Sequence, residues 1–285
     1  MKWSNIKELL MHILFFLTAC VSIFAVVLIC VFLFANGIPA IGKIGVFKFL
    51  LGTKWKPGND IYGILPMILG SLYVTAGAII IGVPIGLLTA VFLAKFCPKG
   101  LYKILKPATE LMAGVPSVVY GFFGLVVLVP LVQNIFGVAG NTMLTASVLL
   151  GIMILPTIIG VSESAIRAVP DSYYEGSLAL GASHERSVFF ATLPAARSGI
   201  LAGVVLGIGR AIGETMAVVM VAGNKARMPL GLLDGVRTMT ANIVMEMGYA
   251  TDLHREALIA TAVVLFVFIL IINVTFSLLR RKDRA

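Results

Sequence analysis

The sequence predicts an all-α integral membrane protein with six transmembrane helices. Hydrophobic residues make up 59% of the chain and charged residues only 12%, whereas soluble domains carry about 25% charged residues. Several apolar runs also reach the ~20 residues that a helix needs to cross a bilayer. The short alternating segments of an outer-membrane barrel are not visible. In this context the net charge of +9 indicates membrane topology rather than nucleic-acid binding.

The expected spans are apolar and are separated by polar or charged links. The first run is longer than the apolar core of a signal peptide and ends in Ala35-Asn36-Gly37, so we expect it to be retained as a span. We treat residues 1–285 as a single transmembrane domain. The spans are predicted at about 12–35, 66–94, 112–132, 142–161, 198–222 and 257–279.

The distribution of Lys and Arg orients these spans. An even number of spans places both termini on one side. Positive residues are more frequent at the termini and in the links after the second and fourth spans than in the two long loops at about 37–65 and 223–256. The positive-inside rule therefore predicts cytoplasmic termini and extracytoplasmic long loops.

The chain shows no credible cofactor site. Gly37 to Lys43 has the spacing of a nucleotide-binding loop, but Ile44 stands where a Ser or Thr would bind magnesium. The cysteines and histidines are isolated, so neither a metal site nor a disulfide frame is expected. We expect no catalytic residues, and ATP-driven transport would need a separate ATPase chain with its own ATP and magnesium.

A polar stretch at about 174–194 lies between the fourth and fifth spans, on the predicted cytoplasmic side. Gly181 permits a sharp reversal by adopting positive φ, and Pro194 is expected to stop or redirect the following segment. The stretch reads Tyr174-Glu175-Gly176-Ser177, then Gly181-Ala182, then Leu193-Pro194.

This stretch resembles the EAA loop of the membrane subunits of binding-protein-dependent ABC importers. Gly176-Ser177 replace the usual Ala-Ala, and Ala191 replaces the usual Ile. The resemblance implies a short coupling helix that docks on a cytoplasmic ATPase. An ordinary interfacial loop is the alternative interpretation.

The fifth span carries three glycines four residues apart, Gly199, Gly203 and Gly207. Small residues at this spacing share one helix face and let helices approach closely in lipid. We expect helix packing at this face, with pore lining as the alternative.

Arg210 and Glu214 lie near the middle of the same span, where a charge is costly. In a continuous helix, residues four apart are neighbours on one face. One interpretation is a pair that neutralises itself within the bundle. The interpretation we favour is an anion route lined by Arg210, because a guanidinium matches oxyanions two oxygens at a time. Glu214 would then orient Arg210 and weaken its grip on the anion.

A narrower resemblance covers essentially the whole chain. Residues 209–218, including Thr215, are similar to the fifth-span signature of the membrane subunits of phosphate ABC importers, of the PstC type rather than the partner PstA type. Trp55, Pro57, Gly63 and Leu65-Pro66 resemble the same family's first loop and second span.

This resemblance implies a type I, MetI-like permease architecture in the cytoplasmic membrane of a prokaryote. It also implies a PstA-like second subunit, two PstB-like ATPase subunits and an extracytoplasmic PstS-like phosphate-binding protein, with Arg210, Glu214 and Thr215 in the phosphate path. Asp234, Arg237 and Glu246 either meet the binding protein or form a solvated loop surface. The same architecture with molybdate or sulfate as cargo, the PstA-type subunit, and an ion-coupled secondary transporter remain alternatives.

Overall fold

The computed structural model describes residues 3–282, so the terminal residues that carry part of the charge bias, Lys2 and Arg284 among them, lie outside it. Six helical segments are long and apolar enough to cross a membrane, which confirms the predicted fold class. These segments are Lys7–Ile44, Leu65–Phe96, Ser117–Phe136, Met143–Arg167, His184–Gly213 and Asp252–Thr275.

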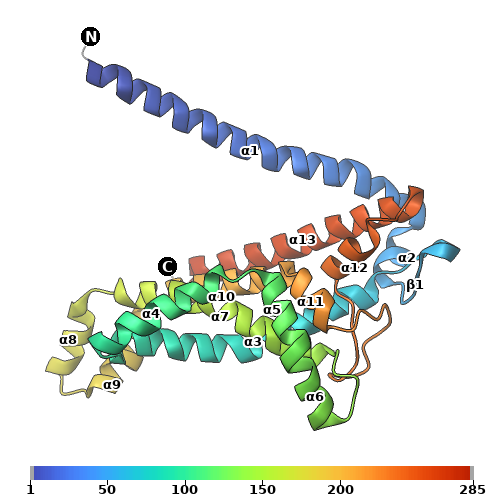
Figure 1. Ribbon diagram of the computed structural model, residues 1–285. Coiled ribbons are helices and arrows are strands. Elements are labelled where there is room, and N and C mark those ends of the chain that lie inside the picture. The colour runs from blue at the N-terminus through green and yellow to red at the C-terminus, as the bar shows by residue number, and fades with distance from the viewer. Residues whose placement is uncertain (1–2, 283–285) are drawn as a thin grey trace.

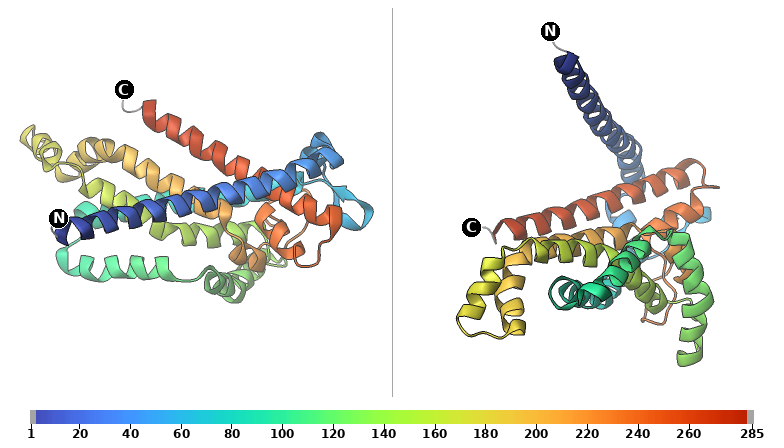
Figure 2. Two further views of the ribbon diagram at one scale, coloured as in Figure 1. Left: turned by 90° about the horizontal axis from the view of Figure 1, so that it is seen from above. Right: turned by 60° about the vertical axis from the view of Figure 1, so that its left-hand side comes forward.

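Most of the long helices run roughly along one axis, and many of the connections lie at its two ends. The short helices α8 (Asp171–Ala179) and α9 (His184–Ser187) lie at one end, near the last turns of α13 (Asp252–Lys282). Helices α2 (Val46–Leu51) and α12 (Met239–Glu246) lie at the other end (Figures 1 and 2). We call these the coupling-loop end and the outer-loop end.

The centre of the molecule is a three-helix core. Helix α7 (Met143–Arg167) packs between α3 (Leu65–Val91) and α10 (Leu193–Gly213). Helix α7 starts with a side-chain cap, because the Thr142 hydroxyl accepts a hydrogen bond from the backbone N–H of Thr145 at 3.2 Å. Small residues on α3 bring the helices close: a methyl group on Gly82 would lie 2.8 Å from Ile154.

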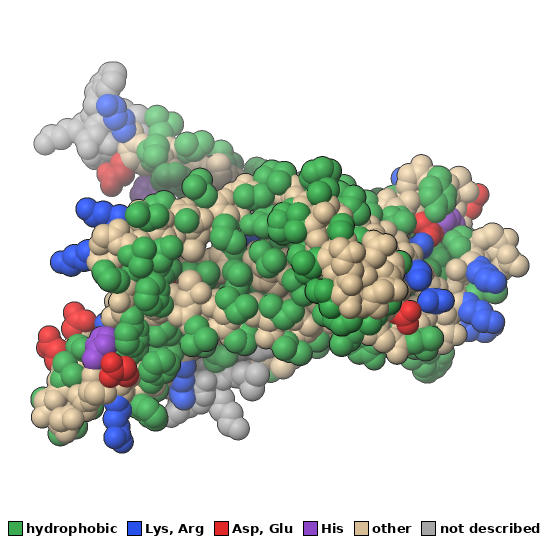
Figure 3. All heavy atoms as spheres, turned by 60° about the horizontal axis from the view of Figure 1, so that its bottom comes forward, with side chains coloured by type: hydrophobic (Ala, Val, Ile, Leu, Met, Phe, Trp, Pro, Cys, Tyr) green, Lys and Arg blue, Asp and Glu red, His purple; other side chains and the backbone are tan. Residues whose placement is uncertain are grey.

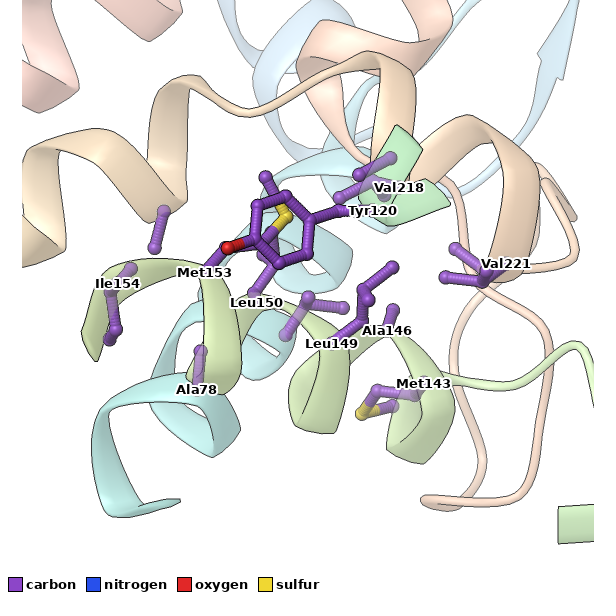
Figure 4. Packing of buried hydrophobic residues seen from close by; sticks show 14 of the residues in the cluster. Ala78, Tyr120, Met143, Ala146, Leu149, Leu150, Met153, Ile154, Val218 and Val221 are labelled. Carbon is purple, nitrogen blue, oxygen red and sulfur yellow. The ribbon is translucent and has the colours of Figure 1, made fainter. Parts of the chain in front are cut away.

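Two shorter helices complete this core at the outer half of the bundle. Helix α5 (Ser117–Phe123) packs on α11 (Met216–Val221), and both cover α7. The contact is close, since a methyl group on Gly121 would lie 3.0 Å from the Cα of Ala217. Figure 4 shows the apolar side chains that meet there, which include Tyr120, Val218, Val221, Leu149, Leu150 and Met153.

The predicted third span is interrupted. Helix α4 (Lys99–Gly114) ends before Pro116, and α5 begins after it. Pro116 has no N–H for the carbonyl of Met112 four residues earlier. The Tyr120 hydroxyl donates to that carbonyl instead, at 2.9 Å. The third span is therefore Ser117–Phe136, which begins after Pro116 rather than at residue 112 as expected.

The remaining elements are mainly short or peripheral. Helix α1 (Trp3–Ile44) contacts α13 near the outer-loop end and diverges from the bundle elsewhere, as Figure 1 shows. Strands β1 (Trp55–Lys56) and β2 (Ile61–Tyr62) form an antiparallel hairpin. The π-helical turns are η2 (Phe92–Phe96), η3 (Gly124–Leu128) and η4 (Val188–Thr192), and α6 (Val129–Phe136) follows η3.

The surface agrees with a membrane environment. Hydrophobic side chains cover the middle of the face in Figure 3, and charged side chains gather at its two ends. Large apolar side chains are exposed on the spans, for example Phe16 at 69% and Ile80 at 73%. Lipid removes the cost of such exposure, which would be large in water.

Candidate functional site

The fifth span breaks at the position of the predicted substrate path. Helix α10 ends at Gly213, Glu214 adopts extended backbone angles (φ −69°, ψ 134°), and α11 starts at Met216. The prediction that Arg210 and Glu214 are neighbours on one continuous helix face is therefore wrong. Interrupted helices place irregular backbone at membrane depth, which is tolerated where it lines a cavity or is buried in protein.

The carboxylate of Glu214 serves this break directly. Its Oε1 accepts the backbone N–H of Thr215 at 3.1 Å and that of Ala217 at 3.2 Å. The side chain thus caps the first turn of α11, where N–H groups have no helical partner. The second carboxylate oxygen, Oε2, keeps its acceptor capacity. The Thr215 hydroxyl donates to the carbonyl of Gly213 at 3.3 Å.

Arg210 projects from the last turn of α10 toward α7. Its guanidinium donates to the hydroxyl of Thr157 at 3.4 Å, a long contact. Among the described residues, no ion pair joins Arg210 to Glu214. In the part of the chain that the structure describes, the contact with Thr157 is the one hydrogen bond that Arg210 makes, so most of its N–H donors stay available.

The three glycines of the fifth span face α7. A methyl group on Gly199 would clash with the Cβ of Ala165. On Gly203 it would lie 3.1 Å from the Ser162 hydroxyl, and on Gly207 3.0 Å from Ile158. This geometry favours the packing interpretation over pore lining.

The polar stretch at 174–194 folds into a compact helical turn and reversal. Helix α8 carries Tyr174, Glu175, Gly176 and Ser177, and Gly181 adopts φ +84°, as the sequence predicts. The N–H groups of Gly181 and Ala182 bond back to α8, at 2.8 Å to Leu178 and 3.2 Å to Ser177. Ser183 then caps α9, since its hydroxyl accepts the N–H of Arg186 at 3.3 Å.

Pro194 does not end the helix, contrary to expectation. The helix continues from His184 to Gly213 through Leu193-Pro194. The π-turn η4 directly precedes Pro194. This wider turn, with i→i+5 bonds, accommodates the missing N–H and the ring of the proline.

Two features of this loop escaped the sequence reasoning. His184 is partly buried and bonded rather than solvated: its Nδ1 lies 2.6 Å from the Tyr174 hydroxyl, and its ring packs edge-on against Phe96. Leu180, at the tip, is 90% exposed. The loop therefore has a fixed inner side, tied to the end of α3 by Phe96, and an outer side that presents Glu175 and Leu180.

A buried carboxylate lies just before the loop. Glu163 of α7 is 1% exposed and accepts three hydrogen bonds of 2.8 Å, from Tyr102, Lys106 and Arg167. The hydrogen bond to Glu163 raises the pKa of both Tyr102 and Lys106. Arg167 also donates to the carbonyl of Leu93 at 2.7 Å. This cluster, the Glu163 cluster, joins α4 and α7 to the turn that follows α3.

A second polar cluster lies at the outer-loop end. Glu246 of α12, 6% exposed, accepts from Arg237 at Oε1 (2.6 Å) and from the Trp55 indole at Oε2 (2.8 Å), and His254 Nε2 lies 2.8 Å from the same Oε2. Arg237 and Glu246 are thus largely buried, so of the two alternatives a solvated loop surface is wrong for them. Only pairing makes such burial of charge tolerable.

The fold and these sites define a class: multi-pass membrane proteins with an interrupted span, as found in transport subunits. Residues 82–284 match the family described as "Binding-protein-dependent transport system inner membrane component", and the chain belongs to this family. The family-level resemblance drawn from the sequence is therefore confirmed.

Curated relatives agree over nearly the full length. The chain is 38% identical over 278 residues to the "Probable ABC transporter permease protein YqgH" of Bacillus subtilis, covering 93% of this chain and 89% of that protein. It is 34% identical over 277 residues to the "Phosphate transport system permease protein PstC" of Mesorhizobium japonicum, covering 90% and 84%.

Solved structures support the architecture. A bacterial alginate ABC transporter chain matches with a TM-score of 0.65 at 17% identity, covering 98% of this chain and 97% of that chain. A chain of an inward-facing methionine ABC transporter matches with a TM-score of 0.63 at 19% identity, covering 81% and 99%. At these identities the likeness shows the type I importer fold.

Proposed function

We propose that this chain is the PstC-type membrane subunit of an ATP-driven importer of inorganic phosphate. The similarity to a phosphate transport permease over 90% of the chain carries this proposal. The interrupted fifth span supports it, because it holds Arg210, whose guanidinium makes one long hydrogen bond among the described residues. Phosphate oxygens are suited to such donors.

In this proposal Arg210, Glu214 and Thr215 border the route of the anion. Arg210 attracts phosphate at membrane depth. Glu214 holds the start of α11 and places negative charge near the route, which limits how tightly phosphate binds. A conducting site must release its cargo as well as attract it.

Energy enters through the coupling loop, residues 174–194, on the cytoplasmic side. The exposed Glu175 and Leu180 form its docking surface for an ATPase subunit. Movement of the ATPase subunits is passed to α3, α4 and α7 by the inner side of the loop. The contacts that pass it on are those of His184, Phe96 and the Glu163 cluster. The helices then move as rigid bodies between outward-facing and inward-facing arrangements.

The working complex in this proposal lies in the cytoplasmic membrane of a prokaryote, with both termini of this chain in the cytoplasm. Its other members are a second, PstA-like permease, two PstB-like ATPase subunits and an extracytoplasmic PstS-like phosphate-binding protein. This chain binds no cofactor; ATP and magnesium belong to the ATPase subunits. The loops at the outer-loop end, including strands β1 and β2, face the binding protein.

Reconstitution of the complete complex in lipid vesicles tests the proposal. We expect uptake of radiolabelled phosphate that requires ATP and the binding protein, and that excess unlabelled phosphate suppresses more than molybdate or sulfate does. Stronger suppression by another oxyanion would reassign the cargo. Uptake that survives ATP removal and collapses with an ion gradient would contradict an ATP-driven importer. Co-purification of the complex distinguishes the PstC-type from the PstA-type position.

A further inference from the structure

The backbone at the break in the fifth span accepts a hydrogen bond from a side-chain hydroxyl of another helix. Glu214 is not helical, so its carbonyl lies outside the hydrogen-bond ladder of α10. The Thr240 hydroxyl donates to this carbonyl at 3.0 Å. Thr240 is only 7% exposed and belongs to α12, which follows the second long loop. A residue of the outer-loop end thus contacts the backbone between Arg210 and Thr215.

The hydrogen bond from Thr240 to Glu214 is the last of a series in which each hydroxyl donates to the next acceptor. The Thr240 and Thr238 hydroxyls lie 3.0 Å apart. Because Thr240 uses its single proton on the Glu214 carbonyl, Thr238 is the donor of that pair. The Thr238 hydroxyl in turn accepts the N–H of Ala241 at 3.2 Å, which caps α12.

Helix α12 is itself firmly placed. The N–H of Met239 donates to the buried hydroxyl of Ser71 on α3 at 3.0 Å. Arg237 just before the helix bonds Glu246 at its end at 2.6 Å and Asn242 at 3.0 Å. Whether the Thr240 hydroxyl reaches the carbonyl of Glu214 therefore depends on where α12 is held against α3.

We propose that Thr240 is a positioning residue for the phosphate route. Its hydroxyl ties the geometry of the Glu214–Thr215 break to the position of α12, so that a change at the outer-loop end alters how Arg210 and Glu214 face the route. This inference rests on the proposed function. The link is a single neutral hydrogen bond, weak enough to break and re-form in each transport cycle.

The test uses the complete complex in vesicles, with uptake of radiolabelled phosphate and ATP hydrolysis measured on the same preparation. Thr240→Val keeps the side-chain shape and removes the hydroxyl, whereas Thr240→Ser keeps the hydroxyl. Thr261→Val is the matched control, because Thr261 is equally buried but its hydroxyl bonds only to the Ala257 carbonyl of its own helix.

We expect T240V to lower phosphate uptake about fivefold, the size of one lost hydrogen bond, with unchanged basal ATP hydrolysis. More ATP is then used for each phosphate imported. T240S restores uptake, and T261V behaves as the unmodified complex. Equal coupling ratios in T240V and the unmodified complex, or a T240S complex as impaired as T240V, would overturn the inference.

A second variant tests the inference if the T240V complex fails to assemble. Ser71→Ala removes the anchor of α12 on α3 and should raise the same ratio of ATP used to phosphate imported. An assembled S71A complex with normal coupling would equally contradict the inference. If the unmodified complex imports no phosphate, the proposed function fails, while the effect of Thr240 on stimulated ATP hydrolysis is still measured.

Discussion

The carboxylate of Glu163 lies 2.8 Å from the Nζ of Lys106, across the contact between α7 and α4. Glu163 also bonds Tyr102 and Arg167, so four side chains from two helices meet at one buried carboxylate. Its burial makes the cluster sensitive to loss of charge, because the remaining cations would be left without a partner.

Glu163→Ala is expected to destabilise the protein by about 2 kcal/mol, which allows for the partial exposure of Lys106 and Arg167. The melting temperature of the assembled complex measures this. Glu110→Gln is the matched control: Glu110 lies 3.6 Å from the same Lys106 but is 65% exposed. Equal melting temperatures for both variants would contradict a structural role for the cluster.

The three glycines of the fifth span that face α7 predict that a larger side chain at this face disturbs helix packing. Gly199→Val introduces side-chain atoms where even a methyl group would clash with the Cβ of Ala165. We expect a loss of about 2 kcal/mol, typical of overpacking, and a reduced yield of assembled complex. Gly209→Ala on the same helix has nothing within 4 Å and should assemble normally. Size-exclusion chromatography with a thermal melt compares them, and equal behaviour would remove the packing interpretation.

The coupling loop offers a third test. Leu180→Asp should weaken association with the ATPase subunit roughly tenfold, the scale of one lost apolar anchor at an interface, without changing the melting temperature of the isolated subunit. Leu230→Asp is the control, because Leu230 is 85% exposed but lies in the loop before α12 at the outer-loop end. Pull-down with the ATPase subunit measures both. Retained binding in L180D would place the docking surface elsewhere.

Apolar length and charge distribution were enough to predict six spans, and the Gly181 reversal followed from one residue type. The break at Glu214–Thr215 did not follow, because the hydrophobic pattern continues unchanged from Ala211 into Met216–Val221. The cap that Glu214 provides depends on its rotamer. Only the sequence Gly213-Glu214-Thr215, a helix-ending glycine followed by capping residues, carried a local signal.

The buried charges were missed for a related reason. Glu163 sits at the end of a span, where charges usually face water. Its burial is set by Tyr102 and Lys106, which lie 61 and 57 residues away along the chain and have no local signature. Glu246 likewise depends on Trp55 from the first long loop. Such long-range partners define both polar clusters, and one chain's sequence does not reveal them.

The proposed transport route depends on Arg210, and a comparison of phosphate uptake with and without its guanidinium tests this role directly. ATP-dependent uptake of radiolabelled phosphate is measured in vesicles that contain equal amounts of the assembled complex, unmodified or with Arg210→Gln. We predict that the variant, with its melting temperature unchanged, loses at least tenfold in uptake, the scale of a lost charge-assisted hydrogen bond. Uptake at the unmodified rate by a stable Arg210→Gln complex would show that Arg210 does not line the phosphate route.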